Sequence, residues 1–182
     1  MPGTVAAPMW TKSFETGSVR QHVCRFLDTN GDGTGTKEAT GNYAAAEEIF
    51  FIKPSATQVF RITRLLVTIE DTNGSTASDY GNITSGLTNG IVIRHSDDSG
   101  VITDYTDGLP IKTNGHWTSF CYDGTPLVWG NGNDMFPVRW TFLKSGQYLR
   151  LDGAVNGRLE AVFNDNLTGL VLHRFLVQGY IE

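Results

Sequence analysis

The clearest pattern in this chain is the alternation of apolar and polar residues over its last third. Apolar side chains recur at every second position, and turn residues at 152–157 interrupt them. This two-residue period places apolar side chains on one face of successive β-strands. Because the pattern runs to the last residue, we expect a strand that closes a sheet and not a trailing tail. The residues predicted to face the core are Leu149, Leu151, Leu159, Ala161, Phe163, Leu170, Leu172, Leu176 and Tyr180.

Earlier segments carry further strand signals. The strongest covers residues 59–70, where β-branched, aromatic and aliphatic side chains predominate. Residues 49–52 are apolar at every position, as in a strand buried on both faces. Residues 43–48 predict either a short helix or the lead into that strand. Further strands are expected at residues 22–27, 90–94, 101–103, 115–123 and 136–144, with the second and third joined as a hairpin.

Together these segments predict an all-β protein of eight or nine strands, with glycine-rich connections. The most economical layout is an antiparallel β-sandwich in a jelly-roll arrangement. The length of 182 residues fits one such domain over residues 21–182. Residues 1–20 hold two prolines and no clear period, which predicts an extended N-terminal arm. Its large apolar residues, Trp10 and Phe14, could pack on this subunit or on a neighbour.

Charge and hydropathy narrow the classes of partner. The chain carries 14 Lys and Arg against 19 Asp and Glu, for a net charge of -5, and the basic residues are scattered. This argues against nucleic-acid binding, which needs a clustered basic face. No apolar run approaches the roughly 20 residues of a membrane-spanning helix, so no membrane partner is expected. We expect synthesis in a cytoplasm, where Cys24 and Cys121, among apolar neighbours, would be buried thiols.

One segment partly matches a calcium-binding loop. Asp28, Asn30, Asp32 and Gly33 follow the opening D-x-N-x-D-G of that motif, in which alternate oxygens converge on the cation. The twelfth position, which should be a bidentate carboxylate, is Ala39. The sequence leaves two interpretations open, a glycine-rich turn and an ion site. The distant donors of such an ion site would be Glu47 and Glu48.

The residues do not predict an enzyme. There is no HxH pair for a cupin-type metal site, no G-x-S-x-G, no C-x-x-C and no phosphate-binding glycine motif. Adjacent carboxylates such as Asp97 and Asp98 are typical of solvated turns. We therefore expect no catalytic residue, no metal and no cofactor. The four histidines are His22, His95, His116 and His173, and His173 alternates with apolar residues as a core or interface side chain does.

Aromatic residues offer one further candidate site. Stacking on exposed rings is a common way to bind sugars, but aromatic side chains in a β-sandwich more often belong to the core. The sequence leaves both interpretations open. The residues concerned are Trp117, Tyr122, Trp129, Trp140 and Phe142.

Several segments carry a likeness that covers most of the chain from Leu27 onward. They are LDTNGDGTGTKEATGNY (27–43), AEEIFFIKP (46–54), RITRLLVTIEDT (61–72), GNITSGLTNGI (81–91), TDGLPIKTNGHW (106–117) and RLDGAVNGRLEAVFNDNLTGLVLHRFLVQGY (150–180). Together they resemble a family of small structural proteins of tailed bacteriophages. This resemblance implies a virion component on the capsid surface, made in the host cytoplasm. It further implies a decoration or cement protein, commonly a homotrimer, that binds and stabilises the shell of major capsid protein.

The chain suits that role in its own features, because a cement protein needs a rigid fold and an adhesive arm or loop. Residues 1–20 and the long polar loop at 71–90 are the expected contact segments. The alternative is a tail-tip or receptor-binding module that recognises host-surface glycans, which would be present in few copies per particle. A hydrolase or metal-dependent enzyme on a β-sandwich is the third and weakest interpretation.

Overall fold

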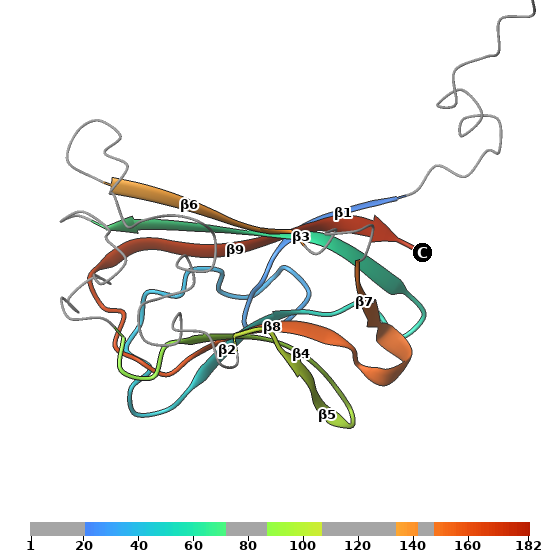
Figure 1. Cartoon of the computed structure of the whole chain (residues 1–182), viewed down its shortest axis with the longest axis horizontal. Coiled ribbons are helices and arrows are strands. Elements are labelled where there is room, and N and C mark those ends of the chain that lie inside the picture. The colour runs from blue at the N-terminus through green and yellow to red at the C-terminus, as the bar shows by residue number, and fades with distance from the viewer. Residues whose placement is uncertain (1–20, 72–86, 107–133, 142–147) are drawn as a thin grey trace, which may run out of the picture.

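Two antiparallel β-sheets pack face to face in the computed structural model of this chain, which describes residues 21–71, 87–106, 134–141 and 148–182 (Figure 1). Only the backbone is described at residues 69–71 and 134–141. The strands are β1 (His22–Phe26), β2 (Glu48–Ile52), β3 (Val59–Asp71), β4 (Ile91–Asp97), β5 (Gly100–Asp104), β6 (Asp134–Thr141), β7 (Leu149–Asp152), β8 (Arg158–Phe163) and β9 (Leu170–Ile181), and a short 3₁₀ helix η2 (Gly153–Val155) joins β7 to β8.

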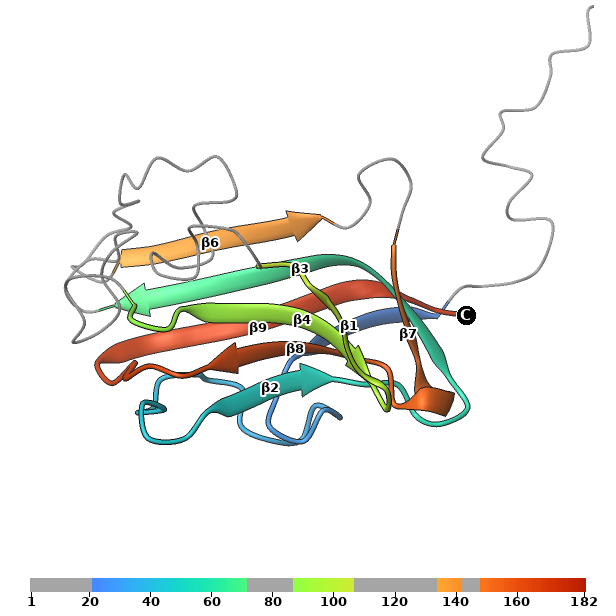
Figure 2. The ribbon, with the colours of Figure 1, turned by 60° about the horizontal axis from the view of Figure 1, so that its bottom comes forward.

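Strand pairing confirms the predicted all-β sandwich. The first sheet has the order β1-β9-β3-β6, and β7 pairs with the first part of β3. The second sheet has the order β2-β8-β4-β5, in which β4 and β5 form the expected hairpin. Figure 2 shows the two layers from a second angle, with β7 at one end of the sandwich. The described part of the chain contains no helix long and apolar enough to cross a membrane.

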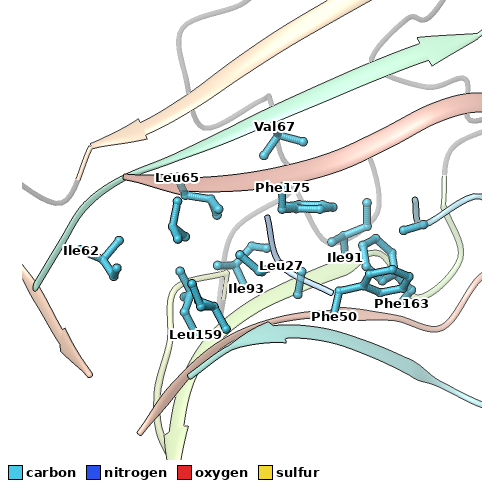
Figure 3. Packing of buried hydrophobic residues seen from close by; sticks show 14 of the residues in the cluster. Leu27, Phe50, Ile62, Leu65, Val67, Ile91, Ile93, Leu159, Phe163 and Phe175 are labelled. Atoms are coloured by element: carbon cyan, nitrogen blue, oxygen red, sulfur yellow. The ribbon is translucent and has the colours of Figure 1, made fainter. Parts of the chain in front are cut away.

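The core lies between the two sheets. The largest fully buried side chains include Phe60 and Phe175 from the first sheet and Phe50 and Phe163 from the second. Figure 3 shows Phe50, Phe163 and Phe175 between the two layers. Rings of Phe50 and Phe175 both meet the ring of Phe163 edge-on, with centroids 5.4 and 5.5 Å apart. Truncating one such ring to alanine costs about 3–5 kcal/mol, because the dense surroundings close the cavity only partly. This aromatic group therefore holds the two layers together.

A bulge in β3 shifts the face that its residues present. Phe60 and Ile62 are buried before it, and Leu65 and Val67 are buried after it. The register against β9 changes between Ile62 and Arg64, so Thr63 is the additional residue. One extra residue moves the inward positions from even to odd numbers. Strict alternation along residues 59–70 would have misplaced half of this strand.

The predicted face of β9 is wrong over most of the strand. Leu172, Leu176 and Tyr180 are only half-buried and lie on the outer face, whereas Phe175 and Val177 are fully buried. The pairing sets this phase, because Val177 pairs with the inward Leu65 of β3. Apolar residues occupy both faces of β9, so alternation alone gives no unique phase. Leu149, Leu151, Leu159, Ala161, Phe163 and Leu170 are buried as predicted.

The glycine-rich segment after β1 ties the two sheets together. Leu27 donates its backbone N–H to the carbonyl of Phe175 in the first sheet, at 2.8 Å. The next residue, Asp28, exchanges two backbone hydrogen bonds with Phe51 in the second sheet, at 3.1 and 2.8 Å. Residues 43–48 lead into β2 without a helix, which decides between the two predicted alternatives. The predicted strand at residues 115–123 and the arm at 1–20 lie outside the described residues.

Candidate binding surfaces and buried polar residues

Asp28 is an anchor for the loop that follows it. Its side chain is fully buried, and its Oδ1 accepts hydrogen bonds from the backbone N–H groups of Asn30 and Gly31. Its Oδ2 accepts the N–H of Gly35 at 2.7 Å. Hydrogen bonds to a charged acceptor are worth about 1.5–3 kcal/mol each. The carboxylate is therefore satisfied by the loop itself.

This geometry favours the glycine-rich turn over the calcium loop. Three N–H donors converge on Asp28, so positive ends of dipoles occupy the space where a cation would lie. Asp32 instead accepts hydrogen bonds from the N–H and the hydroxyl of Thr34, at 2.9 and 2.6 Å, which lower its pKa. Glu47 is exposed, and Glu48 lies in β2. Within the described ranges, no three His, Cys, Asp or Glu residues are grouped as a metal site.

Asp165 acts in the same way on a second loop, and the sequence analysis did not single it out. It is 6 % exposed, and its carboxylate accepts the backbone N–H groups of Thr88, Asn89 and Gly90 at 3.1, 3.0 and 2.9 Å. The turn that Asp165 binds lies more than 70 positions away in the sequence. No local sequence pattern therefore indicates this role of Asp165. Asp28 thus fixes a loop beside β2, and Asp165 fixes the loop that leads into β4.

His173 lies in the core, as the sequence predicts. Its ring is fully buried against the rings of Phe163 and Phe175, with centroids 5.3 and 4.8 Å away. Removal from water lowers the pKa of His173 to about 3, because burial penalises the charged imidazolium. Half-burial also lowers the pKa of His95. His22 is exposed on β1, and His116 lies outside the described residues.

Glu160 is the centre of an ion-pair group on the outer face of the second sheet. Its side chain is 2 % exposed and pairs with Arg94 at 2.5 Å and with Arg158. Burial alone would raise the pKa of Glu160. The hydrogen bonds from Arg94, Ser96 and Arg158 outweigh it, so the pKa lies below its ordinary value. Asp97 and Asp98 accept hydrogen bonds from Ser99 and Asn156 respectively, as turn residues do.

Cys24 is exposed and free, which corrects the prediction of a buried thiol. Its neighbour Val23 points into the core with 4 % exposure, and alternation along β1 turns Cys24 outward. The apolar neighbour Val23 lies on the buried face of β1, whereas Cys24 lies on the opposite, exposed face. Cys121 lies outside the described residues.

Exposed apolar side chains lie in the β4–β5 hairpin and in the neighbouring η2. Val101 and Ile102 of β5 are 55 % and 51 % exposed, and Val155 of η2 is 43 % exposed. The N–H of Asp98 donates to the carbonyl of Val155 at 3.1 Å, and the side-chain amide of Asn156 donates to the Asp98 carboxylate. These bonds hold the hairpin against η2. We call Val101, Ile102 and Val155 the hairpin patch.

A second surface feature is an open depression on the outer face of the first sheet, with a volume of about 470 Å³. It lies over β1, β9 and β3, which run side by side in Figure 1. The residues that line it are His22, Val23, Cys24, Thr63, Arg64, Gln178, Gly179 and Tyr180. None of these residues was singled out as a binding residue in the sequence, because only strand pairing brings them together.

The aromatic residues named as sugar-stacking candidates are not placed by the structure. Trp117, Tyr122, Trp129 and Phe142 lie outside the described residues, and only the backbone of Trp140 is described, in β6. The chain matches no protein-family model, and comparisons with curated proteins and with solved structures give no significant match.

Proposed function

We propose that this chain is a structural protein of a tailed-bacteriophage virion, specifically a decoration or cement subunit that binds the major capsid protein. It acts by burying surface between itself and the shell, without catalysis. Three features support this role: the strand order, the rigidity of its loops and the hairpin patch. The patch carries the proposal, because it is the feature that fits a macromolecular partner most directly.

The strand order supports a jelly roll, a fold that occurs in viral capsid domains. Each sheet draws strands from both ends of the chain, so β1 and β9 are neighbours in one sheet and β2 and β8 in the other. With β7 taken as an addition at the edge of β3, the remaining eight strands form two four-stranded sheets, as a jelly roll requires. Two packed sheets make a stiff body, which suits a protein that stabilises a shell.

The hairpin patch is suited to docking. Burying an exposed Val or Ile side chain contributes about 1.5–3 kcal/mol. The hydrogen bonds between Asp98 and the residues of η2 fix the patch before it meets a partner, so little ordering is required on binding. β5 also lies at the end of the described strand order and contains neither Lys nor Pro, the residues that commonly protect an edge.

Self-association into a homotrimer belongs to the same proposal. The sequence argument for it was that β2 is apolar on both faces. Part of that second face is covered within the chain, because Gly31 lies directly against the ring of Phe51. The homotrimer therefore depends on the remaining outer surface of the sandwich. Sedimentation at micromolar concentration tests it, and a purely monomeric species would contradict it.

The binding test uses purified capsids of the phage that encodes the chain. We expect the wild-type protein to saturate capsids at a fixed ratio to the major capsid protein. Ile102→Asp should weaken binding at least about tenfold, because it removes apolar contact and places a charge in the interface. Val171→Asp is the matched control, since Val171 is 45 % exposed and belongs to the start of β9.

The start of β9 lies at the other end of the sandwich from the β4–β5 hairpin (Figures 1 and 2). Val171→Asp should therefore bind as the wild type does. Equal affinities for the wild type and Ile102→Asp would remove the hairpin patch from the interface. Failure of the wild-type protein to bind capsids would contradict the decoration role and favour the tail-tip alternative.

A further inference from the structure

The depression on the outer face of the first sheet has a simple structural origin. Strand pairing aligns His22 with Tyr180 in one row and Cys24 with Gln178 and Arg64 in the next. Paired residues point to the same face of a sheet. Between the two rows, Val23 is turned into the core. The floor is therefore backbone, and the outward side chains of the two rows form the walls.

The bulge contributes one lining residue of the depression. Thr63, the additional residue of β3, donates its hydroxyl to the carbonyl of Gln178 at 3.0 Å. Gly179 allows the strands to approach closely here, because a Cβ at this position would lie 2.1 Å from the carbonyl oxygen of Arg61. Backbone contacts thus fix the shape of the depression, and a ligand would meet a preformed surface.

The charge of the depression is opposite to that of the chain. Among the residues that the structure describes, no carboxylate lines it, although the chain has more acidic than basic residues. Arg64 is exposed, and its guanidinium contacts the Gln178 side-chain oxygen at 3.4 Å. Among the described residues, no carboxylate forms an ion pair with Arg64. The arginines that do pair with Asp or Glu are Arg61, Arg94, Arg150, Arg158 and Arg174.

An aromatic side chain lies in the row next to that of this arginine. Tyr180 lines the depression and is half-buried. Its ring meets that of Tyr148 at a centroid distance of 6.4 Å, and the guanidinium of Arg61 lies 4.3 Å from the Tyr148 ring centroid. The Arg61 guanidinium also lies 6.0 Å from the Tyr180 ring centroid, so Tyr180 has neighbours that hold its ring in place. A fixed ring, a guanidinium and the polar groups of Thr63 and Gln178 thus surround one preformed space.

We propose that this depression binds a carboxylate-bearing sugar unit of a glycan. Tyr180 packs against the apolar face of the sugar ring, Arg64 pairs with the carboxylate, and Thr63 and Gln178 hydrogen-bond to ring hydroxyls. The guanidinium offers the parallel N–H donors that a carboxylate accepts. The volume lies within the usual range of about 300–1,000 Å³ for small-ligand sites. This site does not depend on whether the protein decorates the head or belongs to the tail.

The test titrates the isolated protein with glucuronate, glucose and acetate, followed by amide chemical shifts. We expect glucuronate to bind with a Kd on the order of 1 mM, as a small ligand on an open site does. Glucose should bind more weakly, and acetate should not saturate. The shifted amides should belong to β1, β3 and β9 around the depression.

Two variants and a matched control locate the site. Arg64→Gln should weaken glucuronate binding about tenfold and leave the weaker glucose binding unchanged. Cys24→Trp should fill the depression and abolish binding of both sugars. Arg25→Gln is the control, because the Arg25 guanidinium lies 5.6 Å from the Phe60 ring centroid and Arg25 does not line the depression. It should bind glucuronate as the wild type does.

Three results would overturn the proposal. One is the absence of shifts with glucuronate at tens of millimolar. Another is equal binding of acetate and glucuronate with the same dependence on Arg64, which would indicate an anion site with no sugar recognition. The third is wild-type affinity in the Cys24→Trp variant with its thermal unfolding unchanged. Because the measurement uses no capsid, its outcome is independent of the decoration role.

Discussion

The buried imidazole of His173 predicts a specific loss of stability in mild acid. In the unfolded chain a histidine has a pKa near 6.5, whereas burial lowers the pKa of His173 to about 3 in the fold. Below the unfolded pKa the unfolded state therefore binds a proton that the native state does not. The contribution of the neutral His173 to stability is therefore fully present above about pH 6.5. It is lost as the pH decreases from there toward 3.

The size of this loss follows from the same values. Each pH unit between the two pKa values costs up to about 1.4 kcal/mol, so acidification from about pH 7.5 to 5 costs about 2 kcal/mol. Total stabilities of domains are about 5–15 kcal/mol, so this fraction is measurable. The carboxylates with lowered pKa values, such as Glu38 beside Arg174, lose their contribution only below their ordinary range. Above about pH 5, the change in stability therefore comes from the histidines.

The assay is urea unfolding at both pH values, applied to the wild type and to His173→Leu. The variant changes the packing against Phe163 and Phe175 equally at both pH values. The difference in unfolding free energy between the two pH values, compared between the wild type and the variant, therefore measures the effect of protonating His173 alone. We expect the wild type to lose about 2 kcal/mol and the variant to lose far less. His95→Gln is the control, and it should reduce the loss by a smaller amount because His95 is only half-buried. An equal loss in the wild type and His173→Leu would refute the reasoning.

Three further predictions concern the anchored loops and the buried ion pair. Asp28→Ala should cost at least about 3 kcal/mol in urea unfolding, because it leaves three backbone N–H groups without their acceptor, and the melting temperature of the wild type should not change with calcium or a chelator. Gly31→Ala should cost about 2 kcal/mol or more, since its φ of +76° is left-handed and its Cβ would lie 2.1 Å from the Phe51 ring; Gly33→Ala, at φ +92° with open space around it, should cost less in the same assay. Glu160→Gln should cost about 3 kcal/mol at neutral pH by leaving Arg94 and Arg158 without their carboxylate, and its unfolding free energy should fall less steeply than that of the wild type below about pH 4.5.

The strands were predictable because burial of one face imposes a two-residue period that local sequence carries. The hairpin of β4 and β5 and the inward residues of β7 and β8 follow directly from it. The phase of β9 was not predictable, because Leu172, His173, Leu176 and Val177 offer apolar or neutral side chains to both faces. Its pairing with β3 decides the phase, and the bulge at Thr63 adjusts that pairing.

The candidate sites depended even more on tertiary structure. Asp28 has the same residue type and spacing whether its oxygens face a cation or the N–H groups of its own loop. Only the backbone conformation of residues 29–35 distinguishes the two. Cys24 was predicted as buried from its neighbours, but the outward turn of its side chain follows from its place in β1. The hairpin patch and the depression each join residues more than 50 positions apart in the sequence, so no local motif predicts them.

The most direct test of the proposed role is the copy number of this polypeptide in purified virions, measured by quantitative mass spectrometry against the major capsid protein. A subunit that covers the shell should be present at a fixed ratio comparable to that of the shell protein, and heads separated from tails should retain it. A few copies per particle, found with the tails, or its absence from the heads would contradict the decoration role.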